Sequence, residues 1–206
     1  FRAPYISRDE LRRHATEFLG CHNPAGTIPV PIELIVEQQF GMDIVPIPGL
    51  QKHFDTVAFL TSDAREIRVD ENVYLNRLSR YRFSLAHELA HRILHARLWQ
   101  EFSFHDIASW KEAVSQSIPE KEYSYIEFHA NTFAGLVLVP SPDLVISFKG
   151  CIAMAEKNGL DISDDATGAL DLVEDYIGRE FQVSAAVVHR RLEAEGLIGE
   201  RYRDHG

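Results

Sequence analysis

The sequence contains few cysteines, few basic residues relative to acidic ones, and no long apolar run. Cys21 and Cys151 are the only cysteines in 206 residues, too few for a disulfide-based fold and suited to a reducing compartment. Lysine and arginine total 21 against 31 aspartates and glutamates, a net charge of −10. Because contacts to phosphate need a basic face, direct nucleic-acid binding is not expected. No apolar run approaches the roughly 20 residues of a membrane-spanning helix, so we expect a cytoplasmic protein without a membrane association.

The remaining composition is that of a globular protein, with 45% hydrophobic and 25% charged residues. The length is sufficient for one substantial domain, with or without a small appendage. No cationic and then apolar signal segment opens the chain. The chain begins with Phe1 and not with methionine, so removal of an upstream segment stays open.

The periodicity of the apolar residues predicts helices before and after a small group of strands. A hairpin is expected between the last two strands, across residues 62–65. Helices are predicted over 8–19, 32–40, 77–95, 119–138 and from 143 onward, strands over 43–48, 56–61 and 66–70, and no assignment is made for the aromatic-rich region after residue 95. This order predicts the α+β class, mainly helical, with a small antiparallel sheet and a C-terminal helical segment.

Three of the ten histidines lie within nine residues, in the run FSLAHELAHRILH. His87 and His91 are one turn apart on a helix, so their imidazoles can bind one tetrahedral zinc ion, and Glu88 beside them can act as a general base toward a zinc-bound water. The opposite face of the helix is almost wholly apolar, which is typical of a helix that borders a cleft. A surface helix with solvated histidines is the alternative. His95 lies ~12 Å from His87 along the helix axis, so we expect it beside the site or at the helix end and not as a third ligand.

The third protein ligand is sought in the helix YSYIEFHANTFAGLVLVP. Glu127 and Asn131 share one stripe of this helix, and the small Ala134 permits close approach to a partner helix. Glu127 is the predicted ligand, because Glu120 lies two turns away and Glu122 and His129 face other directions. A surface Glu/Asn pair is the alternative. The other candidate ligands considered nearby are Glu101, Glu112 and His105.

These residues carry a family resemblance. The segment RFSLAHELAHRILH, followed by IEFHANTFAGLVLVP and FQVSAAVVHRRLEAEGLI, resembles the ImmA/IrrE family of zinc metallopeptidases from about Ile32 to Ile198. The resemblance implies a gluzincin-like fold, with one zinc ion per chain held by His87, His91 and Glu127 and with Glu88 activating water. It also implies a zincin-like metallopeptidase domain over residues 1–140 and a helix-turn-helix-like segment over 141–206 packed on it.

Family members cleave helix-turn-helix repressors, so the resemblance implies an endopeptidase that derepresses genes of a mobile element, a prophage or a stress response. A non-catalytic regulator that inactivates its partner by binding, and a zinc hydrolase of small amides, are the alternatives. The C-terminal segment has balanced charge, which favours packing or partner binding over DNA binding. The hairpin over 56–70 could accept substrate as an added strand. Candidates for stabilising the oxyanion stay open among Tyr123, Tyr125, His105 and His129.

Overall fold

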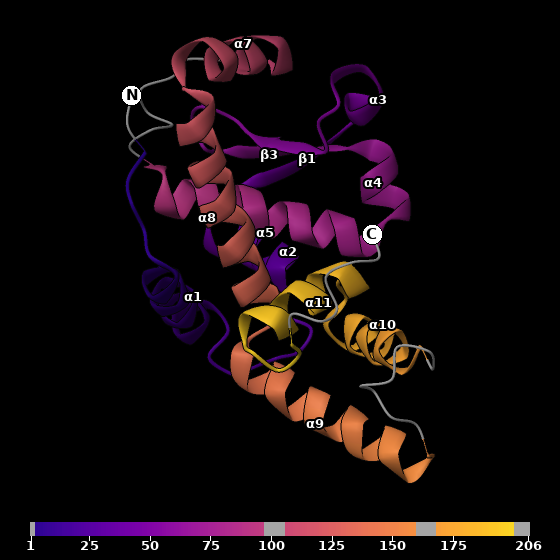
Figure 1. Cartoon of the computed structure of the whole chain (residues 1–206). Coiled ribbons are helices and arrows are strands. Elements are labelled where there is room, and N and C mark those ends of the chain that lie inside the picture. Colours follow the sequence, from indigo (N-terminus) through magenta and orange to yellow (C-terminus); the bar gives the residue numbers. More distant parts are fainter. Residues whose placement is uncertain (1–2, 97–105, 160–167, 200–206) are drawn as a thin grey trace.

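The computed structural model describes residues 3–96, 106–159 and 168–199. Figure 1 shows a small sheet on one side of helix α5, helix α8 crossing α5, and helices α9, α10 and α11 at the opposite end from the sheet. The elements, in chain order, are α1 (Arg8–His22), α2 (Ile32–Leu34), the π-helical turn η1 (Ile35–Gln39), β1 (Asp43–Ile47), α3 (Leu50–Phe54), β2 (Ala58–Leu60), β3 (Glu66–Asp70), α4 (Glu71–Asn76), α5 (Leu78–Leu94), α7 (Ile107–Ser117), α8 (Glu120–Leu138), α9 (Ser141–Lys157), α10 (Ala169–Phe181) and α11 (Ala185–Ala194).

Helix α1 begins where its capping residues predict. Ser7 is the N-cap, and it forms a capping box with Glu10: each side chain bonds to the backbone N–H of the other. The next predicted helix, over residues 32–40, is divided into the short α2 and the wider turn η1. Gly41 follows η1 with φ of +60°, a conformation that suits glycine at the end of a helix.

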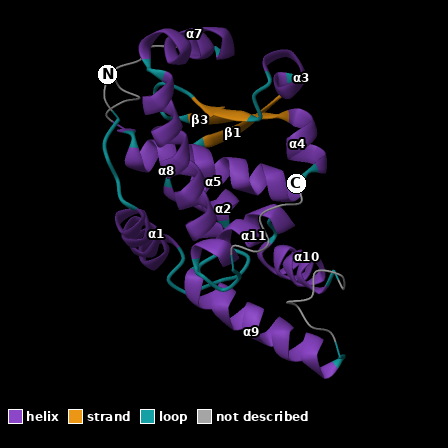
Figure 2. Ribbon diagram, in the orientation of Figure 1, coloured by secondary structure: helices purple, strands orange, loops and turns teal. Residues whose placement is uncertain are grey.

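The three strands form a mixed sheet in the order β1-β3-β2, which confirms the α+β class (Figure 2). The predicted hairpin is present, since β2 and β3 pair antiparallel, with Leu60 opposite Ile67. The expectation of a wholly antiparallel sheet is wrong, because β1 and β3 pair in parallel, from Asp43 opposite Glu66 to Ile47 opposite Asp70. The chain reverses once through α3 and again through the hairpin, so β3 returns in the direction of β1 and lies between the other two strands.

Helices α5 and α8 form the centre of the fold. The two helices contact each other, and both carry buried small residues, Ala86 and Ala90 on α5 and Ala130 and Ala134 on α8. The small side chains allow the two helix backbones to approach closely. Strands β2 and β3 pack on α5 from the side of the sheet. The polar face of α5 therefore lies between the sheet and α8.

The C-terminal helices share the main core. Leu144 of α9, Ile177 of α10 and Leu192 of α11 belong to the same buried hydrophobic cluster as Leu85 and Phe133 of the central helices. The boundary at residue 140 stays a prediction. Within the described residues, no single helix is long and apolar enough to cross a membrane; α8 and α9 pass such a test only as a pair, with a bend of 62° between them.

Candidate metal centre

Helix α5 holds His87, Glu88 and His91 in the orientation that the amphipathic pattern predicts. Its other face is anchored in the core by Leu85 and Leu89, both fully buried. His91 is buried and His87 is half-buried. The helix therefore cannot rotate about its axis without exposing leucine side chains, and the two imidazoles are fixed toward α8.

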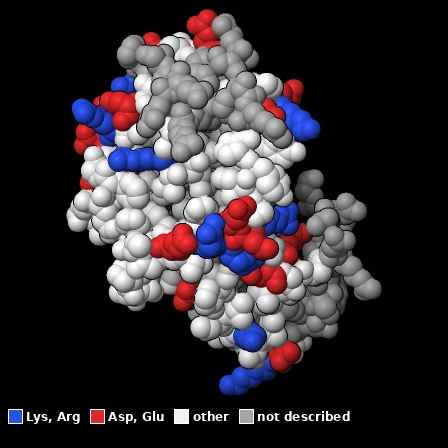
Figure 3. All heavy atoms as spheres, turned by 90° about the vertical axis from the view of Figure 1, so that its left-hand side faces the viewer, with Lys and Arg blue, Asp and Glu red and all other residues white. Residues whose placement is uncertain are grey.

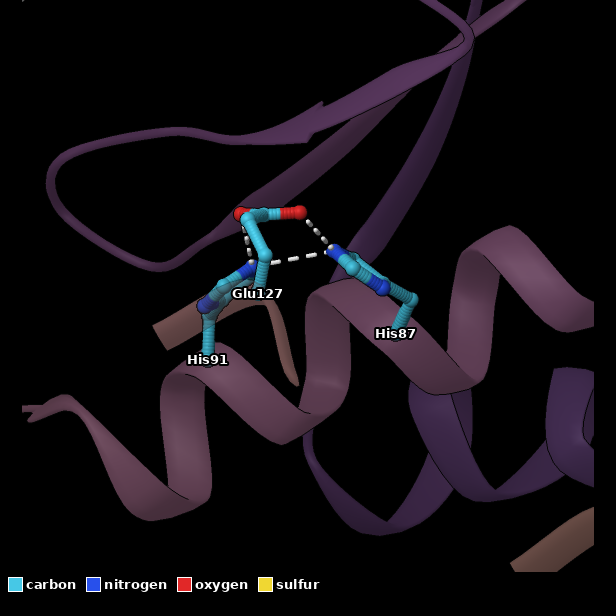
Figure 4. Close-up of side chains that lie close together, drawn as sticks. All are labelled: His87, His91 and Glu127. Carbon is cyan, nitrogen blue, oxygen red and sulfur yellow. Dashed lines mark hydrogen bonds and ion pairs between the residues drawn. The ribbon is translucent and has the colours of Figure 1, made fainter. Parts of the chain in front are cut away.

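The structure brings Glu127 of α8 to both histidines. Its Oε2 lies 3.3 Å from Nε2 of His87 and its Oε1 lies 3.4 Å from Nε2 of His91. The two Nε2 atoms are 3.1 Å apart. Figure 4 shows the carboxylate of Glu127 facing both rings across this small space. Among the residues that the structure describes, these three form a group whose ligand atoms lie close enough to hold one metal ion.

The spacing and chemistry of these donor atoms fit a zinc ion. A tetrahedral ion with ligands at about 2.0–2.2 Å places any two ligand atoms about 3.3–3.5 Å apart. The three separations found here, 3.1, 3.3 and 3.4 Å, lie within a few tenths of an ångström of that range. Two imidazole nitrogens and one carboxylate leave one tetrahedral position open, which is the arrangement of catalytic zinc sites.

The electrostatics of the cluster favour a cation between its members. Burial opposes charge on His87, but the hydrogen bond to Glu127 and the negative charge of Glu88 outweigh it, so the pKa of His87 is raised. Burial likewise opposes charge on Glu127, but the hydrogen bonds from His87 and His91 hold its pKa well below the ordinary range. A carboxylate that stays ionised while half-buried is suited to binding a metal ion.

Glu88 lies beside the cluster and outside the group of metal-competent atoms. Its side chain is buried, and its Oε2 accepts a hydrogen bond of 2.9 Å from the backbone N–H of Leu60 on β2. Burial raises the pKa of Glu88, and the nearby imidazoles of His87 and His91 offset part of that rise. Strand β2 thus holds one oxygen of a buried carboxylate whose basicity is increased and whose charge is felt by His87 and His91.

Hydrogen bonds orient the two imidazoles from behind. Nδ1 of His87 lies 3.3 Å from Oδ1 of Asn131, which is one turn beyond Glu127 on α8. Nδ1 of His91 lies 3.1 Å from Nδ1 of His95, and Nε2 of His95 lies 3.3 Å from Nδ1 of His129. Histidines that bind a metal typically donate their other N–H in this way, which fixes the ring orientation.

His95 is at the C-cap of α5, so it lies at the helix end and next to His91, the two places expected for it. Burial, together with the neighbouring imidazoles, lowers the pKa of His95 to about 2. A neutral His95 can accept a hydrogen bond from His91. The hydrogen bond between His95 and His129 was not predicted, because it joins two helices and leaves no mark on the periodicity of either one.

The remaining candidate metal ligands and oxyanion donors differ in how they lie relative to the cluster. Tyr123 precedes Glu127 by one turn; burial and the negative charge of Glu127 raise the pKa of Tyr123. Tyr125 is exposed and His129 is buried against His95. Glu122 accepts a hydrogen bond from the backbone of Ala3, away from the cluster. Glu112 and Glu120 are exposed and outside the cluster, whereas Glu101 and His105 lie outside the described residues.

Comparisons with known proteins give a consistent result. A family model described as the IrrE N-terminal-like domain, Peptidase_M78, matches residues 37–193. A solved structure titled a Mycobacterium tuberculosis transcriptional regulator is similar, with a TM-score of 0.55 and 18% sequence identity over 98% of this chain. The present chain spans 50% of the length of that structure, so the likeness concerns the fold of one half. No curated protein matches the sequence.

Proposed function

The chain belongs to the Peptidase_M78 family, the IrrE N-terminal-like peptidases, and on this basis we propose that it is a zinc-dependent endopeptidase. The observation that carries the proposal is the cluster of His87, His91 and Glu127 with the buried carboxylate of Glu88 beside it. When bound, a zinc ion would supply Lewis acidity, lowering the pKa of a water molecule to about 7 and polarising the scissile carbonyl.

Glu88 acts as the general base and then the general acid. Its carboxylate accepts a proton from the attacking water and delivers it to the nitrogen of the leaving amine. The N–H of Leu60 holds one carboxylate oxygen in place, so the reacting geometry depends on the contact between β2 and α5. Burial raises the pKa of Glu88, which makes its carboxylate a stronger base.

Tyr123 supplies a hydrogen-bond donor for the oxyanion. Among the described candidates, its pKa is the one that the charges of Glu127 and Glu88 raise, and this raised pKa keeps the phenol protonated at neutral pH. Strand β2 lies at the edge of the sheet, beside Glu88. An extended peptide that pairs with this edge would place its carbonyl near the cluster.

The substrate that the resemblance favours is a helix-turn-helix transcriptional repressor, whose cleavage would release the genes that it controls. The similar solved structure is itself titled a transcriptional regulator. A non-catalytic regulator that inactivates a partner by binding would need the fold and could need the metal. It would have no use for a buried carboxylate held in place beside the two histidines, so Glu88 favours the enzyme.

The test is to incubate the zinc-loaded chain with the helix-turn-helix repressor encoded beside its gene and to identify products by mass spectrometry. We expect one defined cut, abolished by a zinc chelator and restored by added zinc. The matched control is Glu88→Gln, which preserves side-chain size and metal ligands. If Glu88→Gln releases the repressed genes as well as the wild type does, without a cut, the protein acts by binding.

A further inference from the structure

A pocket rich in arginine lies near the cluster of His87, His91 and Glu127, where α1, α5, α8 and α11 meet. Its volume is about 350 Å³. Figure 3 shows basic and acidic side chains side by side in the middle of the face that carries α1, with further charged groups toward its edges. We call it the arginine pocket because Arg8, Arg12, Arg190 and Arg191 line it, together with Asn131 and several apolar side chains.

The charge of the arginine pocket is positive although the chain as a whole is acidic. Four guanidinium groups and one carboxylate line it. Arg12 and Arg191 share the carboxylate of Glu195, at 2.7 Å each, so even with Glu195 included four positive charges face two negative ones. A positive pocket in a chain of net charge −10 attracts an anionic group locally and not through the field of the whole protein.

Two of the four arginines are available to a ligand. Within the described part of the chain, neither Arg8 nor Arg190 has an ion pair, and both are exposed. Arg8 lies over the ring of Phe128, with 5.7 Å between its guanidinium carbon and the ring centroid. This stacking orders the Arg8 side chain while leaving its N–H groups able to donate, which lowers the entropic cost of binding an anion.

The position of the pocket connects it to the metal cluster. Asn131 lines the pocket, and its Oδ1 lies 3.3 Å from Nδ1 of His87. One side chain therefore separates the pocket from a ligand of the cluster. Because an extended peptide advances about 3.3 Å per residue, a side chain within about three residues of the bond at the cluster would reach the pocket.

The apolar part of the lining defines the size of the group that the pocket takes. Phe83, Leu136 and Val187 form walls against which the methylene groups of a side chain can pack. Gly135 allows the aliphatic stem of Arg191 to lie close against α8, since a Cβ there would lie 3.2 Å from Cδ of Arg191. An aliphatic stem that ends in a carboxylate matches walls of this kind with guanidinium groups at the rim.

We propose that the arginine pocket is a specificity subsite that binds the side chain of an aspartate or glutamate in the peptide laid across the cluster. The assignment rests on the proposed peptidase function, and it adds that the enzyme selects an acidic residue near the scissile bond. Arg8 and Arg190 bind the carboxylate, while Arg12 and Arg191 are held in place by Glu195.

The first experiment needs no turnover. Acetyl-glutamate amide, acetyl-glutamine amide and inorganic phosphate are titrated separately into the ¹⁵N-labelled zinc-loaded chain. We expect saturable shifts of the backbone amides of Asn131, Gly135 and Val187 with the acid alone. The double variant Arg8→Gln/Arg190→Gln should lose them, whereas Arg13→Gln, an exposed arginine of α1 outside the lining, should keep them. Shifts caused by phosphate and not by acetyl-glutamate amide would overturn the assignment. The absence of shifts with either compound would overturn it as well.

The second experiment reads specificity from cleavage. A library of peptides of known sequence is digested and the cut sites are identified by mass spectrometry. We expect glutamate or aspartate enriched at one position within three residues of the cut, with kcat/KM about 10–100-fold above the matched glutamine peptide, as one or two hydrogen bonds to a charged group contribute. The enrichment should disappear in Arg8→Gln/Arg190→Gln and persist in Arg13→Gln.

The two experiments separate the subsite from the enzyme. Cleavage without an acidic preference overturns the subsite and leaves the peptidase standing. Absence of all cleavage defeats the peptidase, and the titration still decides whether the arginine pocket binds a carboxylate. Carboxylate binding together with cleavage that ignores acidic residues shows an anion site that is not a substrate subsite, and so also contradicts the proposal.

Discussion

Replacing His95 by leucine should weaken zinc binding, although His95 is not a ligand. If His91 holds the metal through Nε2, its hydrogen is on Nδ1 and points at Nδ1 of His95, 3.1 Å away. His95 must then carry its own hydrogen on Nε2, which donates to Nδ1 of His129 at 3.3 Å. The three rings are each 2% exposed, so water cannot readily replace a lost partner. In His95→Leu the N–H of His91 would have no acceptor whenever the ring faces the metal.

The expected loss can be bounded in two ways. A buried N–H without a partner costs about 1–3 kcal/mol, and each 1.4 kcal/mol corresponds to about a factor of ten in affinity. Loss of a hydrogen-bond partner behind a metal ligand typically lowers metal affinity about 10–100-fold. Both routes predict that the zinc dissociation constant of His95→Leu rises about 10–100-fold while the fold is retained.

The assay is a competition titration against a chromogenic zinc chelator at neutral pH, with the thermal midpoint measured in parallel. His95→Gln keeps a side-chain acceptor and should bind zinc more tightly than His95→Leu. His53→Leu changes an exposed histidine on α3 and should bind zinc as the wild type does. A folded His95→Leu chain with wild-type zinc affinity would refute the hydrogen-bonded chain of histidines as the support of His91.

Further variants separate the other roles. Glu88→Gln should retain zinc binding and lower the rate of repressor cleavage about 100-fold or more, and an unchanged rate would remove its role as base. Tyr123→Phe should lower kcat about 100-fold with little change in zinc affinity, whereas a loss confined to zinc binding would make it a support of Glu127. Burial opposes the charge of Glu195, but the hydrogen bonds of Ser141, Arg12 and Arg191 outweigh it, so its pKa lies below the ordinary value of 4.5. These contacts therefore stabilise the fold above about pH 4.5, and their contribution is lost as the pH falls through the lower folded-state pKa. Urea unfolding of Glu195→Gln should show a loss of about 1–2 kcal/mol at pH 7 that shrinks in acid, and a loss independent of pH would contradict this interpretation.

The candidate cluster could be predicted from the sequence because each half of it lies on one helix. The spacing of His87 and His91 places them on one face of their helix, and Glu127 and Asn131 likewise share a face of theirs. Helical periodicity alone therefore identifies the residues that the structure brings together. Contacts made between elements leave no such pattern. The N–H of Leu60 on Glu88, the hydrogen bond of His95 to His129 and the meeting of Arg8 with Arg190 each depend on how separate elements pack.

In the fold, too, features set within one element could be predicted and features set between elements could not. Helices α1, α5 and α8 begin and end within a few residues of their predicted bounds, since caps and prolines mark them locally. Helices α3 and α4 were not predicted, because five or six residues carry too little periodicity. The parallel pairing of β1 with β3 was missed because strands alternate in the same way in either direction, and only the crossover through α3 decides between them.

The most direct test of the account is the zinc content of the chain, measured by elemental analysis after zinc titration and removal of loosely bound metal at neutral pH. The account predicts one zinc per chain in the wild type, strong loss in Glu127→Ala, and retention in Glu120→Ala, which changes an exposed glutamate of the same helix. Absence of bound zinc in the wild type after titration, or undiminished binding in Glu127→Ala, would contradict it.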